Sequence, residues 1–290
     1  IGKAIAGRRQ ELILATKSLD RTRQGVESHL KLSLERLGVE YVDLYQFHNI
    51  SDMETLDKVV APGGLLSVVE EARKAGLVKH IGITSHQIDV AKEAVKTDRF
   101  ETIMFPLNFL CHEVTEELLP LVRERDIGFI VMKPLAGGVL DNATLAFKYL
   151  LQFPGLTLIA GIEKLPEIEE IARILEEPLA LTPAEQKEIE RLRQELGTTF
   201  CRRCDYCQPC PVGIAISDVT SFPGLIKRLP LARIFSGKFA EVFEKAADCT
   251  ECGDCEEKCP YGLPIREMMV QYSDLFQAEK KKYQEQMASK

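Results

Sequence analysis

The sequence of 290 residues lacks three features that would assign it at once to a class of protein. It has no apolar run near the roughly 18 residues that a membrane-spanning helix needs, so we expect no membrane span. Its 37 Lys and Arg residues form no basic stripe and the formal net charge is −7, which argues against a nucleic-acid partner. It also begins without the charged and then apolar pattern of a signal peptide, and we therefore expect a cytoplasmic protein.

The chain also lacks an initial methionine and begins at Ile1, inside an expected amphipathic helix. We therefore expect that a segment of the protein precedes this residue. Hydrophobic residues make up 45% of the sequence, which suffices for one full core and a small second unit.

Short apolar runs alternate with stretches of helical periodicity over residues 1–197. The predicted strands are Leu12–Thr16, Val42–Phe47, His80–Thr84, Thr102–Leu107, Gly128–Met132 and Thr157–Ile162. Such alternation predicts a parallel sheet, and the continuously apolar strands indicate that helices cover both of its faces. The order allows an open doubly wound α/β sheet or a (β/α)8 TIM barrel, and a barrel would need two further βα units ahead of Ile1.

The cysteine-rich region follows a predicted helix over residues 183–196, which closes the first domain. We accordingly predict two domains, residues 1–197 and residues 198–290. Apolar residues between Phe239 and Ala246 have helical spacing and predict a helix there, with Ser236 as its cap.

Eight of the nine cysteines lie in two similar motifs, CRRCDYCQPCP and CTECGDCEEKCP. They are Cys201, Cys204, Cys207 and Cys210 in the first motif, and Cys249, Cys252, Cys255 and Cys259 in the second. A CxxCxxC run with a fourth cysteine before proline is typical of bacterial ferredoxins, in which the fourth cysteine often binds the other cluster. We therefore predict two 4Fe–4S clusters with crossed ligands, Cys259 serving the first cluster and Cys210 the second.

Zinc is the alternative metal, although four-cysteine zinc sites usually consist of two separated CxxC pairs. Disulfides are disfavoured in a reducing compartment. The second motif matches the ferredoxin pattern fully, whereas the first has two residues instead of three before Cys210. The helical insert between the motifs predicts a small α-helical ferredoxin-like domain.

Polar residues lie at the ends of the predicted strands, where (β/α)8 enzymes build their sites. Lys17 and His48 come first along the chain, and each alone is also explained as a strand-end residue paired with a neighbour. Ser85, His86 and Asn108 end later strands. The loop after the fifth strand, with Lys133, Pro134, Leu135, Gly137 and Gly138, has glycines and amides that predict contact with a pyrophosphate. Gly161, before a helix with Glu170, is placed for the adenosine end of a dinucleotide.

Residues 1–197 resemble an aldo-keto reductase from its second helix onward. The similarity lies in Ala15–Lys17, Leu44–His48, Ile81–Ser85, the strand end at Asn108 and the loop Pro134–Gly138. It implies a (β/α)8 barrel that reduces a carbonyl substrate with a nicotinamide cofactor, with Lys17 and His48 as two of four catalytic residues. The other two, an Asp and a Tyr, are expected ahead of Ile1.

The resemblance also places Lys164 where the preference for the 2′-phosphate is set, but the neighbouring Glu163 has the opposite charge, and the choice between NADH and NADPH stays open. We predict an iron–sulfur oxidoreductase of the ferredoxin-fused aldo-keto reductase type. Because hydride transfer needs no cluster, the cysteine region implies one-electron traffic to a redox protein partner or a further cofactor. The alternative is an electron-transfer subunit in which the barrel is a non-catalytic docking scaffold.

Overall fold

The structure is a computed structural model that describes residues 1–288, and the chain divides into two compact units. The first unit comprises residues 1–106, 112–132 and 154–159. The second unit comprises residues 107–111, 133–153 and 160–290. The predicted division of the chain at residue 197 stays a prediction.

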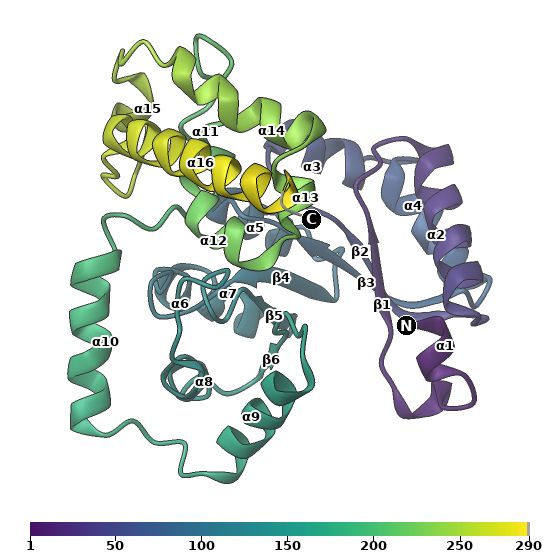
Figure 1. Cartoon of the computed structure of the whole chain (residues 1–290). Coiled ribbons are helices and arrows are strands. Elements are labelled where there is room, and N and C mark those ends of the chain that lie inside the picture. Colours follow the sequence, from purple (N-terminus) through teal and green to yellow (C-terminus); the bar gives the residue numbers. More distant parts are fainter. Residues whose placement is uncertain (289–290) are drawn as a thin grey trace. The chain divides into compact units, whose positions relative to one another are not determined.

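The first unit is built around a sheet of six parallel strands in the order of the sequence (Figure 1). The strands are β1 (Ala15–Ser18), β2 (Val42–Phe47), β3 (Val78–Thr84), β4 (Thr102–Pro106), β5 (Gly128–Met132) and β6 (Leu156–Leu158). Phe47, Ile83 and Val131 are almost fully buried, as expected for strands covered on both faces. The prediction of a parallel α/β sheet is confirmed.

The boundaries of the first and last strands differ from the prediction. β1 begins three residues later than predicted, because Leu12 and Ile13 are exposed and the N–H of Leu14 donates to the carboxylate of Asp43 instead of forming a strand bond. β6 ends at Leu158, so the apolar residues that follow it belong to a loop. Apolar composition alone therefore overestimated both edge strands.

Helices connect the strands and pack on the sheet. In the first unit they are α1 (Gly2–Ile5), η1 (Arg9–Glu11), α2 (Arg23–Leu37), α3 (Met53–Val60), α4 (Leu65–Lys74), α5 (Ile88–Lys96), α6 (Val114–Glu117) and α7 (Leu119–Glu124). The Thr22 side chain caps α2, and Gly38 ends it in the left-handed conformation at φ 67°. α2 contacts β1 and α4, which in turn contacts β3.

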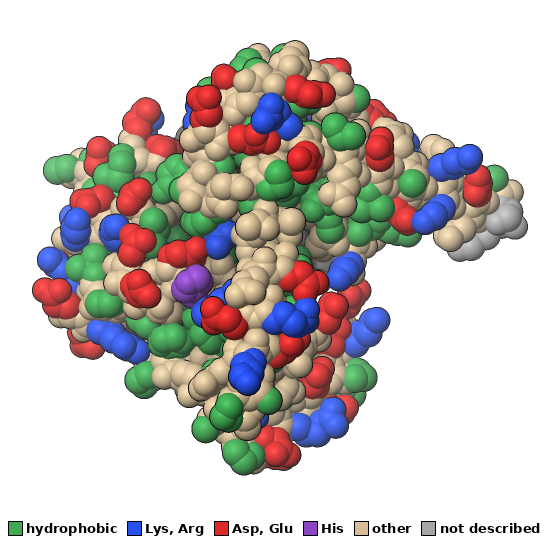
Figure 2. All heavy atoms as spheres, turned by 90° about the vertical axis from the view of Figure 1, so that its left-hand side faces the viewer, with side chains coloured by type: hydrophobic (Ala, Val, Ile, Leu, Met, Phe, Trp, Pro, Cys, Tyr) green, Lys and Arg blue, Asp and Glu red, His purple; other side chains and the backbone are tan. Residues whose placement is uncertain are grey.

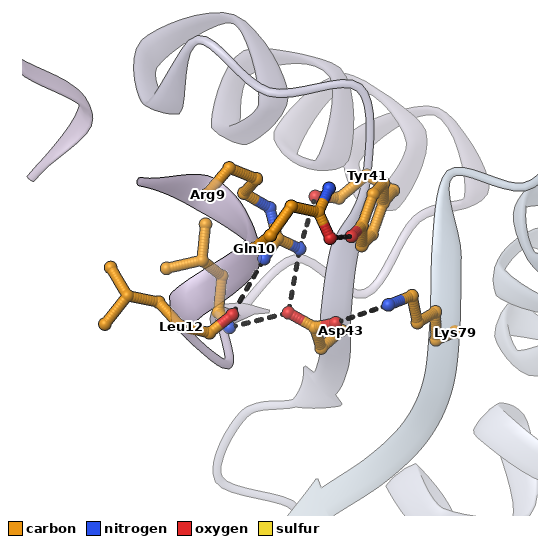
Figure 3. Close-up of polar contacts among 7 residues, drawn as sticks. Arg9, Gln10, Leu12, Tyr41, Asp43 and Lys79 are labelled. Atoms are coloured by element: carbon orange, nitrogen blue, oxygen red, sulfur yellow. Dashed lines mark hydrogen bonds and ion pairs between the residues drawn. The ribbon is translucent and has the colours of Figure 1, made fainter. Parts of the chain in front are cut away.

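A cluster of polar side chains joins η1 to the start of β2 and β3 (Figure 3). The carboxylate of Asp43 accepts hydrogen bonds from Arg9 at 2.7 Å, from Lys79 at 2.9 Å and from the Leu14 N–H at 2.9 Å. The guanidinium of Arg9 also lies 4.1 Å from the centre of the Tyr41 ring. This cluster fixes the chain that leads into the edge strand.

The second unit is helical. Its helices are α8 (Ala143–Leu150), α9 (Leu165–Glu176), α10 (Pro183–Leu196), α11 (Ile216–Thr220), α12 (Phe222–Arg228), α13 (Leu231–Ile234), α14 (Gly237–Glu244), η2 (Lys245–Asp248), α15 (Asp254–Glu257) and α16 (Ile265–Ala288). Phe222, Phe243 and Phe276 pack together with ring centres 4.9 to 5.7 Å apart, and the cysteine motifs contact this core.

The predicted helices of this unit are present at residues 183–196 and between the two cysteine motifs. The prediction that the Ser236 side chain caps the second of these helices, α14, was wrong. The Ser236 hydroxyl donates to the carbonyl of Ala232 and makes no capping bond to α14. Gly237, at φ 55°, supplies the turn at which α14 begins.

The charges on the face drawn in Figure 2 are mixed, with basic and acidic side chains interspersed. Within residues 1–288, no helix combines the length and the apolar character that a membrane crossing requires.

Candidate functional site

Lys17 and His48 come from neighbouring parallel strands of the first unit. Lys17 lies in β1, paired in register with Gln46 of β2, and His48 directly follows β2. Alternate residues of a strand share a face, so Gln46 and His48 lie on the same side of the sheet. The backbone N–H of His48 donates to the carbonyl of Ser18, which extends the β1–β2 pairing to His48.

The surroundings lower the pKa of both side chains. Lys17 is exposed as a residue, yet its ammonium contacts the Met104 sulfur at 3.6 Å, and partial desolvation lowers its pKa. Burial lowers the pKa of His48, and the positive charge of Lys17 lowers it further. At neutral pH, His48 is therefore an uncharged imidazole near a cation.

Gln46 adds an unusual feature to this face. Its side chain is fully buried, and within residues 1–288 neither its amide nitrogen nor its amide oxygen has a hydrogen-bond partner. An unpaired buried amide costs about 1 to 3 kcal/mol. Such a group beside Lys17 and His48 suits a site that receives a polar molecule, and it was not predicted from the sequence.

Arg21 is a second residue of this site that was not predicted. Its guanidinium donates to the carbonyls of His48 at 2.7 Å and Asn49 at 3.1 Å. Burial lowers the pKa of Arg21. It holds the turn that carries His48, and no motif in the sequence signals this contact.

Ser85 and His86 follow β3 and contact the same turn. The Ser85 hydroxyl is buried and donates to the Ile50 carbonyl at 2.7 Å. The Nδ1 of His86 lies 2.9 Å from the Oδ1 of Asn49, a residue with a positive φ of 56°. The four strand-end residues of the first unit that were predicted as site residues therefore lie at one edge of the sheet.

Asn108 and the loop from Lys133 to Gly138 belong to the second unit. The Asn108 side chain is buried and donates to the carbonyl of Lys133 at 3.0 Å. Lys133 and Ala136 have positive φ angles of 57° and 49°, which is uncommon for residues other than glycine. Pro134 is buried, whereas Leu135 is half-buried.

Two backbone amides of this loop form hydrogen bonds within the loop, although we predicted that its amides are available to a pyrophosphate. The backbone N–H of Ala136 donates to the carbonyl of Lys133, and the backbone N–H of Gly138 donates to the carbonyl of Leu135. Gly137 and Gly138 have positive φ angles, so glycine is required there by backbone geometry. Contact with a pyrophosphate stays a prediction for these residues.

Gly161, Lys164 and Glu170 are exposed residues at and before α9. A Cβ atom at Gly161 would meet nothing within 4 Å, so steric crowding does not require glycine at this position. The Glu167 carboxylate accepts from the N–H groups of Glu163 and Lys164 and caps the helix. Their predicted role toward the adenosine end of a cofactor stays untested.

The two cysteine motifs line two separate cavities of the second unit. The lining of one includes Cys201, Cys204, Cys207 and Cys259. The lining of the other includes Cys207, Cys210, Cys249, Cys252 and Cys255. Each cavity thus combines the first three cysteines of one motif with the last cysteine of the other.

The thiols of the first cavity are strongly desolvated. Burial raises the pKa of Cys204 to about 11 and that of Cys207 to about 12. Thiolates at these positions are favoured only beside a strong positive charge, which bound iron supplies. The donor set and its burial therefore fit 4Fe–4S clusters, whose irons are held by cysteine thiolates.

Two family models match the chain. Residues 1–145 match the Aldo/keto reductase family, and residues 200–264 match the 4Fe-4S dicluster domain. The predicted iron–sulfur domain is confirmed, while the number of bound clusters stays a prediction.

Curated relatives share the first part of the chain. The uncharacterized oxidoreductase YqkF of Bacillus subtilis is 32% identical over 157 residues, which are 50% of this chain and 49% of that protein. The NADH-specific methylglyoxal reductase of Escherichia coli is 26% identical over 120 residues, which are 41% and 36% of the two chains. The chain thus spans about half, or less, of the length of these relatives.

Solved structures show the same fold. The holo form of the aldo-keto reductase AKR11C1 from Bacillus halodurans is 28% identical with a TM-score of 0.55, covering 66% of this chain and 75% of that one. An aldo/keto reductase from Klebsiella pneumoniae in complex with NADP and acetate has a TM-score of 0.57 at 18% identity, covering 67% and 74%. The chain therefore belongs to the aldo/keto reductase family and carries a 4Fe–4S dicluster domain in residues 200–264.

Proposed function

We propose that the protein is an oxidoreductase that transfers hydride between a nicotinamide cofactor and a carbonyl or alcohol substrate and exchanges electrons through two 4Fe–4S clusters. The observation that carries this proposal is the position of Lys17 and His48 at the ends of the neighbouring strands β1 and β2, in a chain that also forms two cysteine-lined cavities. A small-molecule carbonyl and a redox protein are the proposed partners.

His48 and Lys17 have different roles in this proposal. The uncharged imidazole of His48 offers one N–H to the carbonyl oxygen and orients it, because burial and then the charge of Lys17 lower the pKa of His48 and disfavour its protonated form. The ammonium of Lys17 stabilises negative charge as it develops on that oxygen, and it lowers the pKa of the tyrosine that the family resemblance places ahead of Ile1. The bound nicotinamide supplies or accepts the hydride.

Gln46 and Arg21 support these roles without touching the hydride. The buried amide of Gln46 is positioned to hydrogen-bond a polar group that enters beside Lys17. Arg21 holds the carbonyls of His48 and Asn49 and so fixes the orientation of the turn. Both residues are positioning residues in the proposed site.

The clusters are proposed to have crossed ligands. The support is that one cavity contains Cys259 with the first three cysteines of the first motif, and the other contains Cys210 with those of the second. The shortened spacing before Cys210 does not remove it from the second cavity. The clusters carry single electrons, whereas hydride transfer moves two, so the proposal requires a redox partner or a further cofactor.

The test replaces Lys17 in the full protein and measures nicotinamide-dependent reduction of a panel of aldehydes and ketones. We expect Lys17→Met to reduce kcat at least about a hundredfold, the scale of one removed oxyanion donor, with iron content and iron–sulfur absorption unchanged. Lys31→Met, an exposed lysine of α2, is the matched control and should keep wild-type activity.

The outcomes separate the enzyme from the scaffold. Undiminished reductase activity in Lys17→Met would refute the assigned role of Lys17. A wild-type protein that contains its clusters, binds no nicotinamide cofactor and reduces no carbonyl would favour the electron-transfer subunit instead.

A further inference from the structure

The second unit contains a further cavity of about 220 Å³ that is distinct from the two described above. Its wall is formed by the predicted pyrophosphate loop, by the segment from the end of α10 to the first cysteine motif, and by helices α12 and α16 with the end of α11. The residues that matter here are Lys133, Gly137, Cys201, Arg203 and Tyr272. Cys201 also lines the first cysteine cavity, so one side chain borders both spaces.

The wall has the chemistry of an anion site. Lys133 and Arg203 contribute positive charge, Tyr272 contributes a hydroxyl, and no carboxylate is among the described residues of the lining. The Ser221 hydroxyl also lines the cavity, but it donates its proton to the carbonyl of Ser217. Arg203 donates to Asp218 at 2.5 Å through one of its terminal nitrogens. A guanidinium has five N–H donors, so this pairing leaves others able to reach a phosphate oxygen.

The backbone around the cavity is held in an unusual form. The positive φ angles of Lys133 and Ala136 are costly for non-glycine residues and are typically maintained where function requires them. At Gly224 of α12, a Cβ atom would lie 3.1 Å from the carbonyl oxygen of Gly137. The absence of a side chain there allows the helix to lie directly against the loop.

We propose that Arg203, together with Tyr272, completes the nicotinamide-cofactor site by binding a phosphate of the dinucleotide. This inference rests on the proposed function, because the loop from Lys133 to Gly138 is the pyrophosphate loop of that proposal. A multiply charged phosphate fits a cavity with two cations better than a neutral molecule does. The iron–sulfur domain then contributes directly to cofactor binding.

The shared wall has a second consequence. A dinucleotide phosphate in this cavity lies in a space bordered by Cys201, which also lines the first cysteine cavity. Negative charge and hydrogen bonds near a ligand thiolate alter its bond to iron. The first cluster therefore responds to cofactor binding even when no electron is transferred.

The experiment compares NADPH binding by isothermal titration calorimetry to the cluster-loaded full protein and its variants. Arg203→Gln should raise the Kd about ten- to a hundredfold, the range expected for a lost hydrogen bond to a charged group. Arg203→Lys should restore part of the affinity, because it keeps the charge but loses the bidentate geometry. Arg233→Gln, an equal charge change in the same domain outside the cavity, should match wild type.

The outcomes distinguish the two proposals. If wild type binds NADPH and Arg203→Gln binds it equally well, this inference is overturned and the proposed function stands. If wild type binds neither NADPH nor NADH, the proposed function fails and this inference fails with it.

A second measurement uses the oxidised protein with NADP⁺, so that no electron can be exchanged. Resonance Raman bands of the iron–cysteine bonds should shift on NADP⁺ addition in wild type and in Arg233→Gln, but not in Arg203→Gln. Identical spectra with and without NADP⁺ in wild type, under conditions where calorimetry shows saturation, would overturn the placement of the phosphate beside Cys201.

Discussion

Replacing Asp43 by Asn should destabilise the first unit through loss of one charge. The Asp43 side chain is 13% exposed and its partner Arg9 is 15% exposed, so this ion pair is mostly removed from water. Asp43→Asn keeps the shape of the side chain but leaves Arg9 without its carboxylate. The amide also has only one acceptor atom for Leu14, Arg9 and Lys79 together.

The magnitude follows from the pKa of Asp43. Burial alone would raise this pKa, but hydrogen bonds from the Leu14 N–H, Lys79 and Arg9 lower it from 3.8 to about 2. A shift of this size corresponds to about 2.4 kcal/mol of stability at neutral pH. Lys79 is 50% exposed, so solvent screens its interaction with Asp43. We therefore expect Asp43→Asn to lower the free energy of unfolding by about 1.5 to 2 kcal/mol.

The sign of the pH dependence is fixed by the lowered pKa. The stabilisation is fully present above the unfolded pKa of 3.8 and is lost as pH falls through the folded pKa of about 2. The difference in unfolding free energy between wild type and Asp43→Asn should therefore be constant between about pH 5.5 and pH 8.

The assay is anaerobic urea unfolding followed by circular dichroism, because the chain has no tryptophan to report by fluorescence. Glu54→Gln is the control, since Glu54 is 80% exposed in its pair with Lys58 and should change stability by less than about 1 kcal/mol. The reasoning fails if Asp43→Asn lowers the free energy of unfolding no more than Glu54→Gln does. It also fails if the loss of unfolding free energy in Asp43→Asn varies across this pH range.

Three further predictions concern the iron–sulfur domain. Anaerobically purified protein should be brown and contain about eight irons per chain, whereas a colourless protein with stoichiometric zinc would contradict the cluster assignment. Cys259→Ala should damage the cluster of Cys201, Cys204 and Cys207, and Cys210→Ala the other one; paramagnetic-resonance spectra of both variants that show the opposite would refute crossed ligation. Arg202 lines the first cysteine cavity, so Arg202→Gln should lower the reduction potential of that cluster by roughly 40 to 90 mV, equivalent to about 1 to 2 kcal/mol for the loss of one nearby positive charge. An unchanged potential in a redox titration would exclude this electrostatic effect.

The sequence predicted the features that depend on local spacing. Strands β2 to β5 are close to their predicted ranges, because each is a buried run bounded by turn residues. The two cysteine motifs were identified for the same reason, since a CxxCxxC run constrains three thiols within a few residues. Lys17 and His48 could be proposed together because parallel strands bring their carboxyl ends to one edge.

The contacts that the sequence did not predict are long-range. The bond from Arg21 to His48 spans 27 residues, and its two partners belong to no common motif. The ion-pair cluster around Asp43 moved the start of β1, although the apolar run Leu12–Leu14 favoured a strand there. The sequence also did not predict the positive φ angles of Lys133 and Ala136, because Lys and Ala rarely adopt this backbone conformation.

The position of Arg203 shows why these long-range contacts matter for function. In the sequence, Arg203 is only the residue before a cluster cysteine, and its charge there has no evident target. In the folded second unit it lines the same cavity as Lys133, which lies 70 positions earlier. If both cations bind one dinucleotide, the cysteine region is part of the cofactor site, and removing it should weaken NADPH binding as well as electron transfer. A domain that served only to carry electrons would leave cofactor affinity unchanged.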